Sequence, residues 1–234
     1  MNLITTIDRP ETHLIDQLST YPSATIHEAQ GRLGALDSAI KPIDRDMSLC
    51  GPAFTVVCAP RDNIMLQVAI SYAQPGDVIV VSAGEYTEAG SFGDVLANAC
   101  LARGIAGLVT DTGVRDTQEI RRLGLPVFSR SVSIKGTVKE TLAPINEPIT
   151  VGGQVIRPGD IIRGDADGVV VIRKEDIQFA IESSRAREDA EAGFIEQYKQ
   201  GKTPIEVSNL GPVLAAKGLS LNSSNTARDL LRQG

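Results

Sequence analysis

Short apolar runs and helical segments alternate between residues 50 and 110, and this alternation restricts the fold more than any other feature of the sequence. Three runs have the length of strands, and two segments between them repeat their apolar residues at helical spacing (strands 54–58, 78–82 and 105–110; helices 63–73 and about 95–103). A strand, a helix and a second strand close as a right-handed crossover, so the three strands are predicted to run parallel. The run Val78-Ile79-Val80-Val81 is apolar at every position, which is typical of a strand covered on both faces.

The rest of the chain extends this pattern into one α/β domain. Two short helices are predicted within 10–36, and further elements follow the parallel strands (helix 115–123, strand 126–129, period-two strands within 135–173, helix 175–199). The long helix is expected to direct six apolar residues toward the core: Ile177, Ala180, Ile181, Ala190, Phe194 and Ile195. Since no linker is evident, we expect a single domain over 1–234, with a core of about 20–200 and a helical tail, 203–234, that packs on a neighbouring subunit.

Composition argues against several classes of partner. The sequence holds 23 Lys and Arg against 29 Asp and Glu, so no broad phosphate-binding surface is expected and nucleic acid is not a predicted ligand. The apolar runs are far shorter than the roughly 20 residues that span a bilayer. The first residues lack the pattern of a secretory signal, so we expect a cytoplasmic protein. The three cysteines have no C-x-x-C spacing and are expected to be buried free thiols, and two histidines are too few for a His-rich zinc site.

Ligands of parallel sheets collect beyond the carboxyl ends of the strands, which directs attention to the loops after residues 82 and 110. The first loop leads through Gly93 into a helix that begins Asp94-Val95-Leu96, and the unpaired amides of that helix start form a seat for a carboxylate or phosphate. The second loop ends in Arg115-Asp116 at another helix start, so we expect Asp94 and Asp116 to meet at one edge of the sheet. Two carboxylates beside an arginine suit Mg²⁺ or Mn²⁺, and the same residues would bind an α-keto acid.

A structural interpretation of these residues stays open. Asp116 and Glu119 form the D-x-x-E pattern of a helix start, in which Asp116 caps unpaired amides. Arg115 would then be a surface ion-pair partner. The local pattern favours the cap, whereas the joint position of Gly93-Asp94 and Arg115-Asp116 at neighbouring strand ends favours a site.

Other motifs are predicted to be structural. Asp165-Ala166-Asp167-Gly168 resembles the start of a calcium loop but lacks the later ligands, so we interpret it as a hairpin turn. His27 falls in a helical segment and is interpreted as a structural histidine. The sequence contains neither a G-x-S-x-G motif nor a P-loop, which argues against the common hydrolase and NTPase classes.

Five segments, within roughly residues 20–200, resemble the RraA-like superfamily: Ala24–Gly31, Phe92–Asp94, Gly113–Asp116, Gly136–Thr141 and Asp165–Val170. The sequence is most similar to the metal-dependent pyruvate aldolase branch, the 4-hydroxy-4-methyl-2-oxoglutarate / 4-carboxy-4-hydroxy-2-oxoadipate aldolases. That branch carries an aspartate, twenty intervening residues and then Arg-Asp, as Asp94 and Arg115-Asp116 do here. The resemblance implies an α-β-β-α sandwich of the swivelling β/β/α type with a parallel-sheet core, assembled as homotrimers or homohexamers.

The resemblance also implies a role for each site residue. Asp116 would bind the metal directly, Asp94 would hold water on it, and Arg115 would stabilise the oxyanion at C2. The amides of Val95 and Leu96, after Gly93, would take the pyruvyl carboxylate. An adjacent subunit would supply a glutamate, for which Glu191 is the best positional match, with Glu188 and Asp189 close by.

The function implied is that of a class II aldolase using Mg²⁺ or Mn²⁺. It would release pyruvate from an oxo-diacid by way of the pyruvate enolate, with oxaloacetate decarboxylation as a second activity. The distal carboxylate needs a basic partner, for which Arg61, Arg32 and Lys135 are all candidates. The alternative is the non-catalytic role of the superfamily's namesake, which binds the ribonuclease E assembly and lacks the complete metal set.

Overall fold

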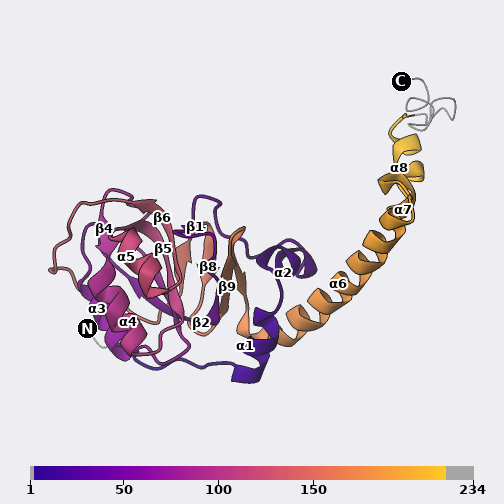
Figure 1. Cartoon of the computed structure of the whole chain (residues 1–234). Coiled ribbons are helices and arrows are strands. Elements are labelled where there is room, and N and C mark those ends of the chain that lie inside the picture. Colours follow the sequence, from indigo (N-terminus) through magenta and orange to yellow (C-terminus); the bar gives the residue numbers. More distant parts are fainter. Residues whose placement is uncertain (1–2, 220–234) are drawn as a thin grey trace. The chain divides into compact units, whose positions relative to one another are not determined.

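The computed structural model describes residues 3–219, and its ordered elements alternate as an α/β chain (Figure 1). The strands are β1 Lys41–Pro42, β2 Leu49–Val57, β3 Val78–Ser82, β4 Gly90–Phe92, β5 Gly107–Val114, β6 Val127–Val132, β7 Ile149–Val151, β8 Gln154–Ile156, β9 Ile161–Asp165 and β10 Gly168–Ile172. The helices are α1 Thr12–Ser19, α2 Ser23–Ala29, α3 Ile64–Tyr72, α4 Asp94–Ala102, α5 Thr117–Leu123, the 3₁₀ turn η1 Lys174–Asp176, α6 Ile177–Lys199, α7 Pro204–Val207 and α8 Gly211–Ala216.

Eight strands form one mixed sheet with a parallel centre. The order along the sheet is β1-β6-β5-β3-β2-β9-β10, and β4 pairs with β5 off this path. The pairs β2–β3, β3–β5 and β5–β6 are parallel, which confirms the predicted crossovers. Strand β2 joins two parts of the sheet, because 49–52 pair antiparallel with β9 and 53–57 pair parallel with β3. The α/β class with a parallel-sheet core is therefore confirmed.

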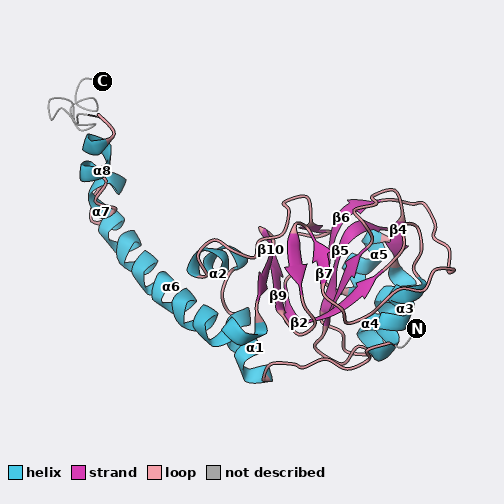
Figure 2. Ribbon diagram, turned by 180° about the vertical axis from the view of Figure 1, so that it is seen from behind, coloured by secondary structure: helices cyan, strands magenta, loops and turns pink. Residues whose placement is uncertain are grey.

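Hydrophobic clusters cover both faces of the central strands. Ile79 and Val81 face one cluster, which α3, α4 and α5 close with residues such as Met65 and Ile120. Val78 and Val80 face the other cluster, which contains residues of β7–β10. Figure 2 shows α3, α4 and α5 together on one side of the strands. The fully apolar run at 78–81 is thus explained by burial on both faces.

The chain divides into two compact units, 1–185 and 186–234, which are described separately. In the first unit α1, α2 and the beginning of α6 pack on β9 and β10, where Ile177, Ala180 and Ile181 are buried. In the second unit Ala190, Phe194 and Ile195 are exposed, so the prediction that they face the core is wrong. An apolar helical period marks one face of a helix, but it does not say what covers that face.

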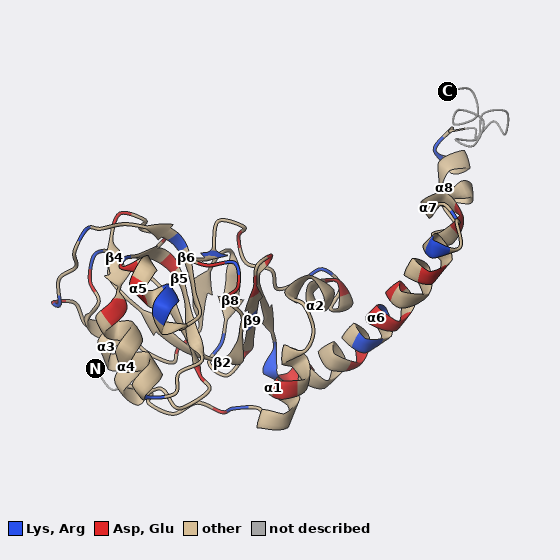
Figure 3. Cartoon of the chain, viewed as in Figure 1, with Lys and Arg blue, Asp and Glu red and all other residues tan. Residues whose placement is uncertain are grey.

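The second unit contains the rest of α6 and the short helices α7 and α8, and α7 begins with a capping box between Thr203 and Glu206. Basic and acidic residues are interspersed along α6 (Figure 3). The predicted tail, 203–234, falls within the described residues only as far as 219, and its contact with a neighbouring subunit stays a prediction, as does the single-domain assignment.

Two predictions about chemistry can be compared with the fold. Cys50, Cys58 and Cys100 are free thiols, and burial raises the pKa of each to about 12, so none is a thiolate at neutral pH. Cys50 is only partly buried.

Within residues 3–219, no helix combines the length and apolar character needed to cross a membrane.

Candidate active site

Two parallel strands end side by side and deliver the predicted residues to one place. β4 pairs with the last part of β5, with Gly90 opposite Gly113 and Phe92 opposite Val114. The amide of Arg115 donates a hydrogen bond of 2.8 Å to the carbonyl of Phe92. Gly93-Asp94 and Arg115-Asp116 therefore leave the sheet as neighbours.

The strand ends differ from those predicted. β5 continues to Val114 rather than ending at residue 110, and β4 was not predicted at all. Asp111 and Thr112 were assigned to the loop after this strand, but they are buried inside it with their polar atoms paired. Asp111 accepts hydrogen bonds from the amides of Ala83 and Glu85, and burial raises its pKa.

Asp116 does not cap α5. It stands at the N-cap position, but its side chain accepts no hydrogen bond from the helix, and Glu119 pairs instead with Arg122. The backbone of Asp116 is left-handed, with φ 55° and ψ 34°, a conformation that is unfavourable for a residue with a Cβ. Its Oδ2 lies 3.4 Å from Nε of Arg115. The capping interpretation is therefore wrong, and the strained backbone is typical of functional positions.

Gly93 makes room for this carboxylate. A Cβ at Gly93 would lie 2.3 Å from Oδ2 of Asp116 and 3.2 Å from Nε of Arg115. The glycine is required by this close approach and not by its backbone angles, which are extended (φ −141°, ψ −172°).

The beginning of α4 presents Asp94 beside the same pocket. Asp94 is the first residue of the helix, and its Oδ1 accepts a hydrogen bond of 2.8 Å from the amide of Val95. The carbonyl of Gly93 accepts the first bond within the helix, from Ala97. Of the two amides predicted as a carboxylate seat, that of Val95 is therefore held by Asp94, and only that of Leu96 has no partner among the described residues. A negative group is stabilised at such a helix start.

A pocket of about 40 Å³ lies between these residues, and nine residues line it: Asn63, Gly90, Ser91, Gly93, Asp94, Val95, Leu96, Arg115 and Asp116. It thus brings together every site residue predicted in 93–116. Sequence reasoning missed Asn63, whose Nδ2 donates to the carbonyl of Ser91 at 3.0 Å and whose Oδ1 accepts from Gln67. Asn63 follows β2, which is also one of the parallel strands. The rule that ligands collect beyond the carboxyl ends of such strands (the strand-end rule) would have identified Asn63 if it had been applied to β2 as well.

The donors of this pocket suit a hard divalent cation. Asp94 and Asp116 offer carboxylate oxygens, which Mg²⁺ and Mn²⁺ prefer, and such ions keep several waters. Within residues 3–219, no three His, Cys, Asp or Glu side chains come together as a complete ligand group. Two carboxylates from one chain therefore leave further positions for water, substrate or another subunit.

Other predicted residues lie elsewhere. Glu191 belongs to the second unit, where it pairs with Arg187 at 2.9 Å. Asp165 and Gly168 close the β9–β10 hairpin, as predicted, and Asp165 accepts hydrogen bonds from Ser23. Nδ1 of His27 lies 2.9 Å from the carbonyl of Leu33. A larger cavity, about 560 Å³, adjoins His27, Arg173 and Phe179, but it contains neither of the aspartates at the strand ends.

Comparison with known proteins gives a consistent assignment. Residues 12–171 match the family model described as RraA-like, Aldolase/RraA. A protein of Halalkalibacterium halodurans named "Putative 4-hydroxy-4-methyl-2-oxoglutarate aldolase" is 39% identical over 183 residues, which cover 78% of this chain and 87% of that protein. An uncharacterized protein of Methanocaldococcus jannaschii is 33% identical, over 74% of this chain and 84% of that protein.

Solved structures share the fold. The crystal structure of Streptomyces coelicolor RraAS2, titled an unusual member of the RNase ES inhibitor RraA protein family, has a TM-score of 0.72 and 29% identity, and the match covers 81% of this chain and 100% of that one. An uncharacterized protein from Pseudomonas syringae pv. tomato has a TM-score of 0.74 and 25% identity, over 86% of this chain and 99% of that one.

Proposed function

The chain belongs to the RraA-like Aldolase/RraA family, and from this we propose that it is a class II aldolase dependent on a divalent metal. Its substrates would be 4-hydroxy-4-methyl-2-oxoglutarate, cleaved to two molecules of pyruvate, and 4-carboxy-4-hydroxy-2-oxoadipate, cleaved to pyruvate and oxaloacetate. The observation that carries the proposal is the Asp116 carboxylate, which is turned away from the helix it precedes and toward Arg115, in the space left by Gly93.

Five residues of the pocket have a role in the proposed reaction. Asp116, with Asp94 through water, would hold Mg²⁺ or Mn²⁺, which when bound supplies Lewis acidity at the 2-oxo group. The amide of Leu96 would receive the pyruvyl carboxylate at the start of α4, joined by the amide of Val95 once the carboxylate takes the place of Oδ1 of Asp94. The Arg115 guanidinium donates to the oxygen on C2, where negative charge grows as the C3–C4 bond breaks. Asp94 accepts the proton of the C4 hydroxyl through an intervening water.

The same enolate forms when oxaloacetate loses carbon dioxide, so the protein is expected to decarboxylate oxaloacetate as well. Both reactions need charge stabilisation at the C2 oxygen, and neither needs a Schiff-base lysine. We also assign the protein to the cytoplasm and expect neither nucleic acid nor membrane as a partner.

The site is proposed to be completed by another copy of the chain, in a homotrimer or homohexamer. Among residues 3–219 of one chain, only Asp94 and Asp116 offer carboxylates at the pocket. Glu191 is the first candidate for a third carboxylate from the adjacent subunit, and Glu188 and Asp189 are the alternatives. Exposed apolar residues on the same unit, Phe194 and Ile195 among them, suit a surface that another subunit covers.

Release of pyruvate tests the proposal. Purified protein with Mg²⁺ or Mn²⁺ is mixed with oxaloacetate or 4-hydroxy-4-methyl-2-oxoglutarate, and pyruvate is followed through lactate dehydrogenase and NADH, with spontaneous decarboxylation subtracted. We expect pyruvate from both substrates and none above background after chelation of the metal. If neither substrate yields pyruvate, the proposal is wrong.

A regulatory role without chemistry is the second candidate. It is favoured by the likeness to the Streptomyces coelicolor protein whose title places it in an RNase inhibitor family. Titration of Mn²⁺ into the parent and into Asp116→Ala, followed by calorimetry, separates the two. An aldolase loses metal affinity in the variant, whereas a binding module that uses no metal gives the same trace for both proteins.

A further inference from the structure

The pocket holds only part of an oxo-diacid. Its volume is about 40 Å³, which is small beside a diacid with five or six backbone carbons. If the pyruvyl group occupies this space, the distal half of the diacid lies against the residues around the mouth. That half carries a second carboxylate, which needs a positive partner to leave water.

Asn63 lines the pocket, and the turn 60–63 that leads into it has a backbone fixed from two sides. Asp62 is only 2% exposed and accepts hydrogen bonds of 2.8–2.9 Å from the amides of Ile64, Glu140 and Thr141. The amide of Val138 donates to the carbonyl of Arg61 at 2.9 Å. The turn thereby ties the segment 138–141 to the residue before α3, Asn63, which lines the pocket. We name this set of bonds the Asp62 clamp.

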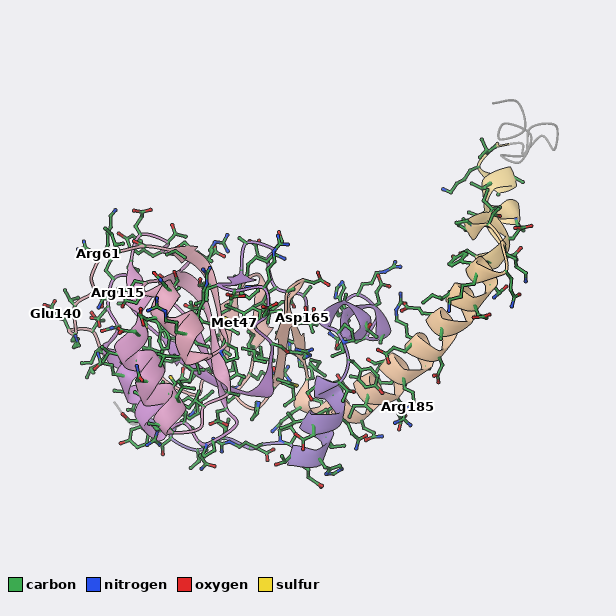
Figure 4. All side chains as sticks on the ribbon, viewed as in Figure 1. Met47, Arg61, Arg115, Glu140, Asp165 and Arg185 are labelled. Atoms are coloured by element: carbon green, nitrogen blue, oxygen red, sulfur yellow. The ribbon has the colours of Figure 1, made fainter. Side chains whose placement is uncertain are left out.

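Arg61 occupies a strained position on this turn. Its φ is 61°, in the left-handed region where glycine is favoured and a side chain is strained. Among residues 3–219 the guanidinium has neither a hydrogen bond nor an ion pair, and the residue is exposed. Arg61 and Arg115 are labelled at the same end of the molecule in Figure 4. A long cationic side chain therefore stands two residues from the pocket wall without a partner.

The other cations offered by the sequence are less suitable. Nζ of Lys135 is bound to the Glu88 carboxylate at 2.5 Å. The bond to Glu88 raises the pKa of Lys135, and the positive charge of Arg61 acts in the opposite direction. Arg61 and Lys135 therefore lie close enough to interact electrostatically. Arg32 pairs with Glu28 and lines the larger cavity near α2. Lys139 has no partner in the described chain, but its ammonium is a point charge, whereas a guanidinium matches both oxygens of a carboxylate.

We propose that Arg61, held by the Asp62 clamp, binds the distal carboxylate and makes the site selective for oxo-diacids over oxo-monoacids. This inference rests on the proposed function, since it assumes that a 2-oxo acid occupies the pocket beside Arg115. It adds a residue that determines specificity outside the group of residues that surrounds the metal.

The test compares two unreactive ligands of equal chain length, 2-oxoglutarate and 2-oxopentanoate, in the presence of Mn²⁺. Calorimetry gives the dissociation constant of each for the parent, Arg61→Met, Lys139→Met and Arg32→Met. Methionine keeps an unbranched apolar stem and removes the charge, and Arg32 lies on another element as the matched control. Circular dichroism melting shows that each variant is folded.

We expect the parent to prefer the diacid about 10- to 100-fold, as one charge-assisted pair allows, and Arg61→Met to lose that preference with 2-oxopentanoate affinity unchanged. Lys139→Met and Arg32→Met should keep it. If Arg61→Met keeps the preference, or Lys139→Met alone removes it, the assignment to Arg61 is wrong. A parent that binds both acids equally also overturns the inference and leaves the proposed function standing, whereas a parent that binds neither contradicts the proposed function itself.

Discussion

The carboxylate of Asp116 lies 3.4 Å from the guanidinium of Arg115, measured from Oδ2 to Nε, although the two residues are consecutive in the chain. This arrangement depends on the left-handed backbone of Asp116, which turns its side chain away from the amides of α5. A residue selected only to begin a helix would use its carboxylate as a cap and avoid this conformation. The strained backbone and the missing cap at Asp116 therefore lower the stability of the folded protein, while they place a carboxylate beside a cation in the site.

Asp116→Gly is expected to raise stability and abolish metal binding. Glycine adopts a φ near 55° without the steric cost of a Cβ, so the variant should gain about 1 kcal/mol, and it loses no helix cap. Thermal melting and Mn²⁺ titration measure the two effects. A lower melting temperature would show that Asp116 stabilises α5 after all.

Gly93→Ala is expected to fold but to bind metal at least tenfold more weakly. The added methyl would lie 2.3 Å from Oδ2 of Asp116, so the carboxylate must move. Gly136→Ala is the matched control, because a Cβ there meets no atom within 4 Å and the backbone does not require glycine. Equal Mn²⁺ affinity in the two variants would mean that the space at Gly93 has no part in the metal site.

Arg115→Lys is expected to reduce kcat nearly as much as Arg115→Ala, by about 100- to 1000-fold. The loss follows because an ammonium cannot reproduce the directed fork of donors that the guanidinium aims at the C2 oxygen. Steady-state pyruvate release measures the rates. If lysine retains most of the turnover, a positive charge alone is sufficient and the directed role of Arg115 is refuted.

Asp62→Asn is expected to destabilise the protein at pH 7 by about 1–3 kcal/mol, since a buried amide nitrogen would face backbone donors. Burial alone would raise the pKa of Asp62, but hydrogen bonds from Ile64, Glu140 and Thr141 outweigh it and lower the pKa. A lowered folded-state pKa adds stability above the unfolded pKa of about 4, and this stability is lost as the pH falls through the folded value.

Urea unfolding at several pH values measures the free energy of unfolding of the parent and of Asp62→Asn, with Asp16→Asn on the exposed side of α1 as the control. The difference in unfolding free energy between the parent and Asp62→Asn should be largest near neutral pH and should decrease on acidification. A gap that stays constant down to pH 3 would show that the ionised carboxylate contributes no stability through the Asp62 clamp.

The sequence predicts the parallel centre of the fold because those strands are long enough to show their pattern. β3 is apolar from Val78 to Val81, and the helices on either side repeat their apolar residues at helical spacing. It does not predict β4, since three residues, Gly90–Phe92, are too few for any period and contain a glycine. The predicted end of β5 was too early because Asp111 and Thr112 are polar, and only the structure shows their buried partners.

The candidate site, like the fold, could be predicted from the sequence only in part. The strand-end rule brings Asp94 and Arg115-Asp116 together, because glycines and acidic residues follow two neighbouring strands. Local pattern alone could not choose between cap and site at Asp116, since both use an aspartate before a helix. The choice depends on the φ of one residue, which the sequence D-T-Q-E does not encode by itself. The apolar period of α6 likewise could not distinguish a covered face from the exposed one at Phe194 and Ile195.

Formation of the pyruvate enolate is the central claim, and proton exchange measures it without a diacid substrate. Pyruvate is incubated in D₂O with the protein and Mg²⁺ or Mn²⁺, and the methyl signal is followed by NMR. We predict that the signal decays with the parent and metal, and that it persists after chelation or in Arg115→Ala. No exchange with the parent and metal, or equal exchange in Arg115→Ala, would contradict the account.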